Sequence, residues 1–330
     1  MLKKAILASG VASAMAASTL AGAATVYDQD GTKLDLYARI AMGIEGGGLE
    51  TPMSDNGAEF VNVGSRLQLT GSHQISDDLR AFARVQWRFT GDERDRSSGF
   101  QEVRNSYIGL ESEGLGTLMA GNYDSFYNSY VTEPFDVYVQ DGYELGGGGL
   151  QARGDSLGYI TPNLAGFTAF LSAKHYDKRG EAQNAASSEI VTQGGVRFES
   201  GPLFLALGYV DDEDGRAGGR GEMIYGATVA YAITDAISAR LGYETQDKNF
   251  DTLGLGMTFK TGAWKFHADL YNQDIDGVSS DRTTWAAAAH YKLSSSLDFF
   301  VELNDADNDF DNQPNESDDL YYIAGARYHF

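Results

Sequence analysis

The sequence of 330 residues contains no cysteine, only 5 prolines and few basic side chains. Without cysteine there is no disulfide scaffold, no thiol nucleophile and no cysteine-ligated zinc or iron–sulfur site. The 25 Lys and Arg against 47 Asp and Glu give a net charge of -22, which argues against nucleic acid as a partner because phosphates need a basic face. Beyond the N-terminal segment, no stretch approaches the ~18 consecutive apolar residues of a transmembrane helix.

What the sequence does contain favours β-structure. It has 40 glycines and a large aromatic load of 19 Tyr, 17 Phe and 3 Trp. Aromatic residues are enriched in strands, and glycines with few prolines suit long strands joined by tight turns. We therefore expect an all-β chain rather than a helical or disordered one.

Residues 1–23 are expected to be a secretory signal peptide rather than part of the fold. Lys3 and Lys4 precede an apolar and small-residue run from Ala5 to Leu20, and Ala21-Gly22-Ala23 is a small-x-small cleavage signal. The alternative is a short N-terminal membrane anchor, but the apolar run is shorter than the ~20 residues that a spanning helix needs. The mature chain, residues 24–330, is then exported.

Apolar and polar residues alternate along much of the mature chain. In one segment Leu79, Ala81, Ala83, Val85, Trp87 and Phe89 alternate with Arg80, Phe82, Arg84, Gln86 and Arg88. Successive side chains of a strand point to opposite faces, so such segments have one apolar and one mostly polar face. The same alternation occurs in residues 34–44, 61–70, 167–174, 237–244 and 297–304.

Two kinds of connection take turns between these segments. Short polar or glycine turns, such as Ser76-Asp77-Asp78 and Thr261-Gly262, alternate with longer acidic, glycine-rich segments near 46–60, 91–100, 123–149, 177–188, 211–221, 247–249, 274–281 and 305–318. The breaks divide the chain into sixteen candidate strands. Short periplasmic turns and long extracellular loops are typical of an outer-membrane barrel. We therefore predict a 16-stranded antiparallel transmembrane β-barrel with short turns at its periplasmic rim and long loops at its extracellular rim.

A secreted β-sandwich is the soluble alternative, since its strands also alternate apolar and polar residues and are also joined by turns. Its polar face would be solvent-exposed, whereas the polar faces here carry repeated arginines among glycine, Gln and Asn, which better fits a water-filled lumen. Rings near strand ends are candidates for the aromatic girdles of a barrel: Tyr209, Tyr231, Tyr243, Trp264, Trp285, Tyr291, Tyr322 and Tyr328.

The start and the end of the mature chain resemble trimeric general diffusion porins of Gram-negative outer membranes. The resemblance is carried by residues 24–37, by Ser65-Arg66-Leu67 with residues 74–79, by residues 104–110 and by the closing Tyr328-His329-Phe330. It implies a sixteen-stranded homotrimeric barrel whose third long loop, residues 123–149, folds inward and narrows the pore. It also implies that the outer-membrane assembly machinery recognises the strand ending in Phe330.

The resemblance further implies a cluster of basic residues on the wall facing this loop, at Arg39, Arg66, Arg104 and Arg153. The alternation independently puts Arg39 and Arg66 on the polar face and adds Arg84 and Arg88. The loop carries the candidate acidic residues Glu133, Asp136, Asp141 and Glu144, of which Glu133 and Asp136 flank a Pro134-Phe135 turn.

Opposed positive and negative walls across a narrow aqueous passage set up a transverse field that favours small polar solutes over apolar ones. We therefore expect passive diffusion of small hydrophilic solutes and ions. Acidic mouths suggest a weak cation preference, testable by reversal potential. The expected partners are two further copies of the chain and outer-membrane lipid and lipopolysaccharide; no cofactor is expected.

Three other functions stay open. A sugar-specific channel needs a ladder of lumen aromatics, and the candidates Tyr37, Phe82, Phe170 and Tyr271 form no evident run. An enzymatic barrel needs a catalytic constellation, and the nearest candidate, His267 with Asp269, is better interpreted as a lumen ion pair. The acidic segment 305–316 resembles a calcium loop, but Phe310 occupies the position that demands glycine.

Overall fold

The computed structural model describes residues 23–48, 57–92, 94, 99–140, 142, 144–146, 154–176, 189–211, 221–277, 281–305 and 320–330. The predicted signal peptide lies outside these residues except for Ala23. Within the described part, the helices are the short α1 (Phe126–Tyr130) and the 3-10 turn η1 (Glu133–Phe135). Among the described residues, no helix is long and apolar enough to cross a membrane.

All remaining regular structure is β-strand, as the alternation predicts. The strands are β1 (Ala24–Gln29), β2 (Thr32–Gly47), β3 (Glu59–Asn62), β4 (Arg66–Gln74), β5 (Leu79–Phe89), β6 (Phe100–Ser112), β7 (Gly116–Asn122), β8 (Ser156–Ile160), β9 (Phe167–Tyr176), β10 (Glu189–Ser200), β11 (Leu203–Val210), β12 (Ile224–Ala232), β13 (Ile237–Gln246), β14 (Phe250–Thr261), β15 (Trp264–Ile275), β16 (Arg282–Lys292), β17 (Leu297–Asp305) and β18 (Leu320–His329).

The strands close into one antiparallel barrel. From β4 onward each strand pairs with the next, and β18 returns to pair with β2. Strands β3 and β4 both pair with β2 and are two halves of one wall strand, interrupted at residues 63–65 where Gly64 takes a φ of +68°. The wall therefore has sixteen strands, which confirms the predicted barrel.

Strand β1 is an addition to this wall. It folds back on β2 through Asp30-Gly31, whose φ angles of 51° and 74° are the left-handed values of a two-residue hairpin turn. The C-terminal strand ends beside it, because Phe330 exchanges backbone hydrogen bonds with Ala38 on β2. Both ends of the described chain thus lie along the same strand.

The barrel is apolar outside and polar inside. On β14, Leu253, Leu255 and Met257 are 48%, 56% and 51% exposed, whereas Thr252 and Thr258 on either side of them are buried. Removing apolar surface from water lowers the free energy of the folded protein. The arrangement is therefore stable when lipid, and not water, covers the outer face. The alternation therefore predicted the inner and outer faces of the strands.

The two rims differ in their connections. One rim, here called the short-turn rim, holds the connections at residues 30–31, 75–78, 113–115, 161–166, 201–202, 233–236, 262–263 and 293–296. The opposite rim holds the other eight, which include the long segment between β7 and β8. Not all of these are long, since β13 and β14 are joined by residues 247–249 alone.

Aromatic rings mark the outer face near both rims. Of the eight predicted girdle residues, six are exposed large side chains, and Tyr209 and Tyr291 are half-buried. Trp264 stacks on Phe266 at 5.6 Å beside the short-turn rim. Rings of this kind place an apolar body in lipid and a polar edge at the headgroups.

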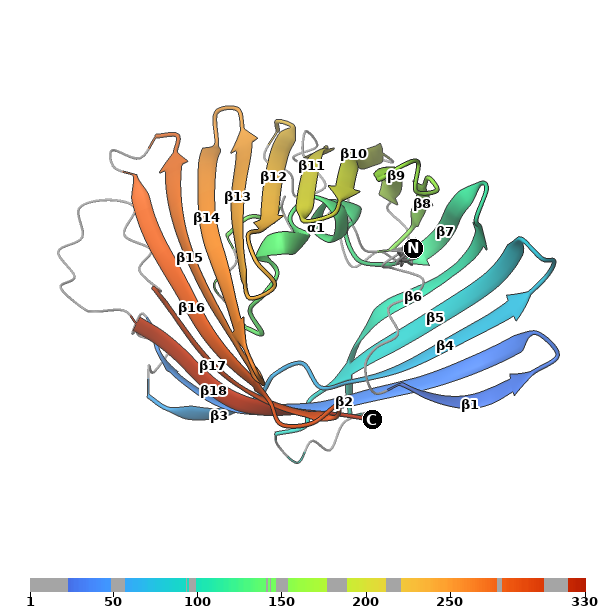
Figure 1. The fold of residues 1–330 in the computed structure, drawn as a ribbon, viewed down its shortest axis with the longest axis horizontal. Helices are drawn as coiled ribbons and strands as arrows, with labels where there is room; N and C mark the ends of the chain where they lie inside the picture. The colour runs from blue at the N-terminus through green and yellow to red at the C-terminus, as the bar shows by residue number, and fades with distance from the viewer. Residues whose placement is uncertain are drawn as a thin grey trace, which may run out of the picture.

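Inside the barrel, the segment after β7 carries α1 and then η1, and Figure 1 shows α1 on the inner side of the wall. Helix α1 lies against the inner side of β9, β10 and β11. This segment and the wall that it leaves uncovered define the candidate site.

Candidate pore constriction

Three arginines stand directly opposite one another on the inner wall. Arg39 of β2 pairs in register with Arg66 of β4, and Arg66 pairs in register with Arg88 of β5. Like charges at directly opposite positions of a sheet destabilise it. We call Arg39, Arg66 and Arg88 the arginine row; such an arrangement costs folding energy and therefore indicates a functional role.

The break between β3 and β4 supports the arginine row. Arg39 donates from Nη2 to the carbonyl oxygen of Gly64 at 2.8 Å, and Arg66 donates from Nε to the same oxygen at 3.1 Å. A carbonyl shared by two guanidinium groups reduces their mutual repulsion and fixes their orientation. Guanidinium groups stay charged even when crowded, which an ammonium group does less well.

A β-bulge brings Arg104 beside the row. In the pairing of β5 with β6, Gln86 opposes Asn105 and Trp87 opposes Val103, so Arg104 has no opposite residue. Bulges of this kind re-aim side chains. Both Arg104 and Asn105 lie inside the barrel, and Arg104 forms a 3.1 Å ion pair with Asp124 at the start of the inner segment.

The bulge also corrects one expectation from the alternation. Because Arg104 points inward, the alternation of a regular strand would turn Asn105 and Gly109 outward. Instead Asn105 is buried, and a side chain at Gly109 would meet the ring of Phe82 in the lumen. One inserted residue reverses the two faces over the rest of β6.

Arg84 and Arg88 both lie on the inner wall, as predicted. The Arg84 guanidinium lies over the ring of Tyr107, 5.7 Å from its centroid, and Arg88 forms a 3.2 Å ion pair with Glu102. Arg84 opposes Thr70 in register, further along the wall than the arginine row. The remaining predicted basic residue, Arg153, lies outside the described residues.

The inner segment is attached to the opposite wall at its beginning. The Gln193 side chain of β10 accepts hydrogen bonds from the Ser125 hydroxyl at 2.8 Å and the Tyr127 backbone N–H at 2.9 Å. Tyr127 in turn donates from its hydroxyl to Glu244 of β13 at 2.9 Å. A Cβ added at Gly226 would lie 1.7 Å from that hydroxyl, so the ring fits only because this wall position has no side chain.

Aromatic packing fills the space between α1 and the wall. Phe126 and Tyr130 contact Phe170 of β9, the latter as a stacked pair with ring centroids 5.0 Å apart. The cluster continues through Tyr123 to Tyr107 of β6 and then to Phe82 of β5. Two of the lumen aromatics identified in the sequence, Phe82 and Phe170, are therefore packed against the inner segment.

Two carboxylates hold the next part of the segment. Asp269 of β15 is bound by Arg240 of β13, with 2.8 Å between Nε and Oδ1, and accepts a hydrogen bond from the Tyr138 hydroxyl at 2.6 Å. Glu302 of β17 accepts the backbone N–H groups of residues 139 and 140. The predicted ion pair of His267 with Asp269 is wrong: Asp269 pairs with Arg240, and the His267 ring is hydrogen-bonded to the Thr258 hydroxyl.

The predicted acidic residues are not grouped. Glu133 forms a 2.7 Å ion pair with Arg197 of β10, and Glu144 lies 3.4 Å from Arg282 of β16. Asp136 is exposed to the lumen and interacts electrostatically with Arg104 and Arg66. Asp141 lies outside the described residues.

Sequence reasoning missed several charged residues of the lumen. Asp124, Arg197 and Glu302 all contact the inner segment or the basic residues beside it. The alternation assigns such residues to the inner face, but it gives no information on which of them meet across the barrel. Within the described residues no group of three His, Cys, Asp or Glu side chains is placed to hold a metal ion, and most of the acidic 305–316 segment lies outside them.

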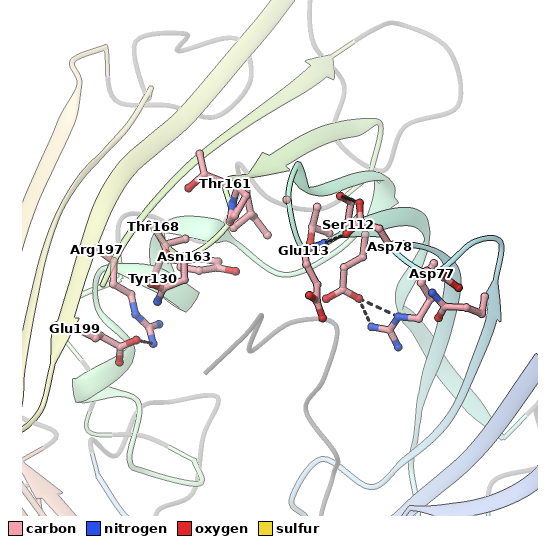
Figure 2. A pocket seen from close by; sticks show the side chains of 17 residues that line it. Asp77, Asp78, Ser112, Glu113, Tyr130, Thr161, Asn163, Thr168, Arg197 and Glu199 are labelled. Atoms are coloured by element: carbon pink, nitrogen blue, oxygen red, sulfur yellow. Dashed lines mark hydrogen bonds and ion pairs between the residues drawn. The ribbon is translucent and has the colours of Figure 1, made fainter. Parts of the chain in front are cut away.

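A cavity lies in the lumen beside the short-turn rim, between the Arg197 region and the turns after β4 and β6 (Figure 2). Its volume is about 480 Å³. Arg197 pairs there with Glu199 at 2.7 Å, and Arg80 pairs with Glu111. Because Asp77, Asp78 and Glu113 line the cavity as well, acidic groups outnumber basic ones in this part of the lumen.

Comparison with known proteins identifies the family. The family model described as Gram-negative porin matches residues 5–312. The Major outer membrane protein of Pasteurella multocida is 31% identical over 336 residues, which cover 91% of this chain and 92% of that protein. The Monosaccharide porin of a Halomonas species is 27% identical over 310 residues, or 84% of this chain and 81% of that protein.

Structural comparison supports the fold. The structure of Salmonella typhi OmpF in complex with daunomycin superimposes with a TM-score of 0.71 and 15% identity, covering 93% of this chain and all of that one. The fold and the sequence therefore agree. The barrel has sixteen strands, an apolar outer surface and a charged lumen, and the family model matches most of the chain. The chain belongs to the Gram-negative porin family and is a β-barrel channel of the outer membrane.

Proposed function

We propose that the arginine row, with Arg104, forms the basic side of the constriction of this diffusion pore, and that Asp136 forms its acidic side. The observation that carries the proposal is the direct register of Arg39, Arg66 and Arg88 on the wall that faces the inner segment. Separated charges of opposite sign across a narrow aqueous passage create a transverse field. Small polar solutes align with this field, and apolar solutes must displace the ordered water.

Reversal potential across a salt gradient in a planar lipid film tests the basic side. The triple substitution R39Q/R66Q/R88Q is expected to raise the conductance and to shift the reversal potential toward cation preference. About a twofold change in relative permeability is expected per removed charge, from the Coulomb energy in water at ~10 Å. A reversal potential that does not move would contradict the assignment of these arginines to the constriction.

The similarity to a monosaccharide porin makes sugar selectivity the alternative. A sugar-specific pore needs aromatic faces open to the passage. Here Phe82, Phe126 and Phe170 are buried in the contact between the inner segment and the wall, so their faces are covered. This favours general diffusion, and a saturable block of conductance by glucose would support sugar selectivity instead.

Catalysis has little support in the lumen. The His267 ring is bonded to the Thr258 hydroxyl, and Arg240 holds both Thr258 and Asp269. Each polar group of this cluster already has a structural partner, so we propose a channel without enzymatic activity. Lipase and protease assays of the purified protein test this.

We further propose that the functional unit is a homotrimer. The outer faces of β4 to β7 carry small residues, Gly71, Ala83, Ser106 and Ala120, around a shallow depression of about 390 Å³. Elsewhere the outer face carries Leu, Phe, Tyr and Trp. Small residues allow close contact between chains within a membrane, which supports the trimer that the family resemblance implies.

Gly71→Leu tests the contact, because a side chain at this position meets no atom of its own subunit within 4 Å. The folded barrel is expected to persist while the trimer dissociates on mild detergent electrophoresis. Leu255→Ala, on the far side of the barrel, is the control and leaves the trimer intact. A trimer that stays stable in the Gly71→Leu variant would show that the contact between subunits lies elsewhere on the barrel.

Two proposals concern export and assembly. Cleavage before Ala24 removes residues 1–23, which fits the start of β1 at Ala24; the mass of the protein isolated from membranes tests this. The assembly machinery recognises the last strand, whose outward Tyr328 and Phe330 are 50% and 49% exposed. Lipopolysaccharide is proposed as the lipid partner at the rim opposite the short turns.

A further inference from the structure

Three lysines lie on the inner wall next to the short-turn rim. Lys260 at the end of β14 pairs in register with Lys265 at the start of β15, and Lys292 ends β16. Each shares its face with a buried lumen residue two or four positions away: Thr258, His267 and Ala288. All three side chains are exposed to the lumen and not to lipid. We call Lys260, Lys265 and Lys292 the lysine trio.

The trio forms no ion pair with the acidic residues that the structure describes. Among the described residues, no carboxylate lies within 4.0 Å of any of the three ammonium groups. Lys265 interacts electrostatically with Lys260, Arg327 and Lys292, and also with the Asp298 carboxylate. The nearby Asp298 is already held by Arg327 at 2.7 Å and by His329 at 3.0 Å. In a chain with 47 acidic residues against 25 basic ones, an uncompensated basic group of this size is not a consequence of composition.

A cavity of about 560 Å³ joins the trio to the constriction. Its lining includes the three lysines, Arg327, Arg39 and Arg66, with Asp298 as its one carboxylate. Cationic groups therefore continue from the short-turn rim to the arginine row. An anion that enters from this rim stays close to positive charge up to the narrowest part of the pore.

The second cavity on the same rim shows that this charge is local. Asp77, Asp78, Glu111, Glu113 and Glu199 line it together with Arg80 and Arg197 (Figure 2). Both arginines there are paired with carboxylates. Two neighbouring parts of one rim thus have opposite electrostatic character, so a general basic bias of the rim does not explain the trio.

We propose that the lysine trio is a binding site for polyvalent oxyanions of the phosphate type at the periplasmic end of the pore. Ammonium groups are compact point charges with three donors each, and they bind phosphate oxygens well. A divalent anion gains about twice the Coulomb energy of chloride from the same three charges. The cavity is roomy enough for inorganic phosphate or a small phosphomonoester. The inference rests on the channel function of the preceding subsection.

Phosphate block of single-channel current tests the site. Inorganic phosphate replaces part of the chloride at constant ionic strength and near-neutral pH, on one side of a planar film at a time. In the wild-type channel, phosphate is expected to reduce the chloride current saturably, and more strongly from the periplasmic side. In K260Q/K265Q/K292Q the block is expected to weaken by roughly twofold or more per lysine removed.

The matched control is K248Q, which removes a lysine at the opposite rim whose partners are Glu222 and Asp247. Its block is expected to equal that of the wild type. Equal block in the wild type and the triple variant would overturn the site, as would equal block from both sides. A wild-type film that conducts no current would instead contradict the channel, and heat-modifiable mobility on gels confirms that each variant is a folded barrel.

Discussion

The two sides of the lumen use charge in opposite ways. On the wall of β2 to β6, Arg39, Arg66 and Arg88 stand side by side with like charge and face water. On the wall of β10 to β17, Arg240 is buried in a pair with Asp269, and Glu302 is buried under two backbone N–H groups of the inner segment. The first wall places like charges next to one another, whereas the second uses paired charges to hold the segment in place.

The same substitution on the two walls separates these roles. Arg240→Gln leaves Asp269 buried without its cation and is expected to destabilise the barrel by about 3–5 kcal/mol, the usual cost of breaking a buried pair. Arg39→Gln removes a repulsion and is expected to stabilise the barrel by a few tenths of a kcal/mol. Urea unfolding in detergent micelles measures both. Equal effects would remove the distinction between the walls.

Glu302→Gln tests the attachment of the inner segment with a smaller change. A neutral amide accepts the N–H groups of residues 139 and 140 less strongly than a carboxylate, and hydrogen bonds to charged groups contribute about 1.5–3 kcal/mol. We expect the channel to close at lower voltage and to show noisier open-state current. Glu102→Gln, on the arginine side, is the control and is expected to leave the closing voltage unchanged.

The acidic residues of the inner segment are expected to differ in their effect on selectivity. Asp136 interacts electrostatically with Arg66 and Arg104, while Glu144 lies beside Arg282. Asp136→Asn is expected to shift the relative permeability toward anions by about twofold. Glu144→Gln is expected to shift it less. Reversal potentials under the same salt gradient compare them, and a larger effect of Glu144 would place the acidic side of the constriction elsewhere.

The smallest expected effect concerns the turns. Hydrogen bonds from the Ser112 hydroxyl and the Glu113 N–H lower the pKa of Asp78 below its usual value. A lowered pKa in the folded state adds stability above the unfolded pKa of about 3.9, and this is lost as the pH falls through the folded value. The wild type is therefore expected to be more stable than Asp78→Asn at neutral pH, and this difference in the free energy of unfolding is expected to vanish in acid. A difference that stays unchanged as the pH falls below the unfolded pKa of about 3.9 would contradict this.

Much of the wall was predictable because strand side chains alternate with a period of two residues. That period assigned Arg39, Arg66, Arg84 and Arg88 to the lumen, and the turns gave sixteen strands. It failed at Arg104, where a bulge inserts one residue and reverses the faces after it. No local pattern announces such a bulge, since it depends on the pairing with β5.

The partners of the inner segment were not predictable for a different reason. Glu133 and Asp136 are three residues apart, yet one pairs with Arg197 of β10 and the other interacts with the arginines of β4 and β6. Which side each faces is decided by contacts across the barrel, such as Tyr127 with Glu244, more than a hundred residues later in the chain. The lysine trio was missed similarly, because periodicity gives the face of a residue but not its height or its neighbours.

Two glycines of the wall strands that make room for the inner segment have a consequence for assembly. Gly226 makes room for Tyr127, and Gly242 makes room for Phe135. Both glycines lie in strands made long after the segment that they receive. The seat of this segment is therefore complete only when the carboxyl-terminal half of the barrel has been inserted, and we expect the passage to narrow late in biogenesis.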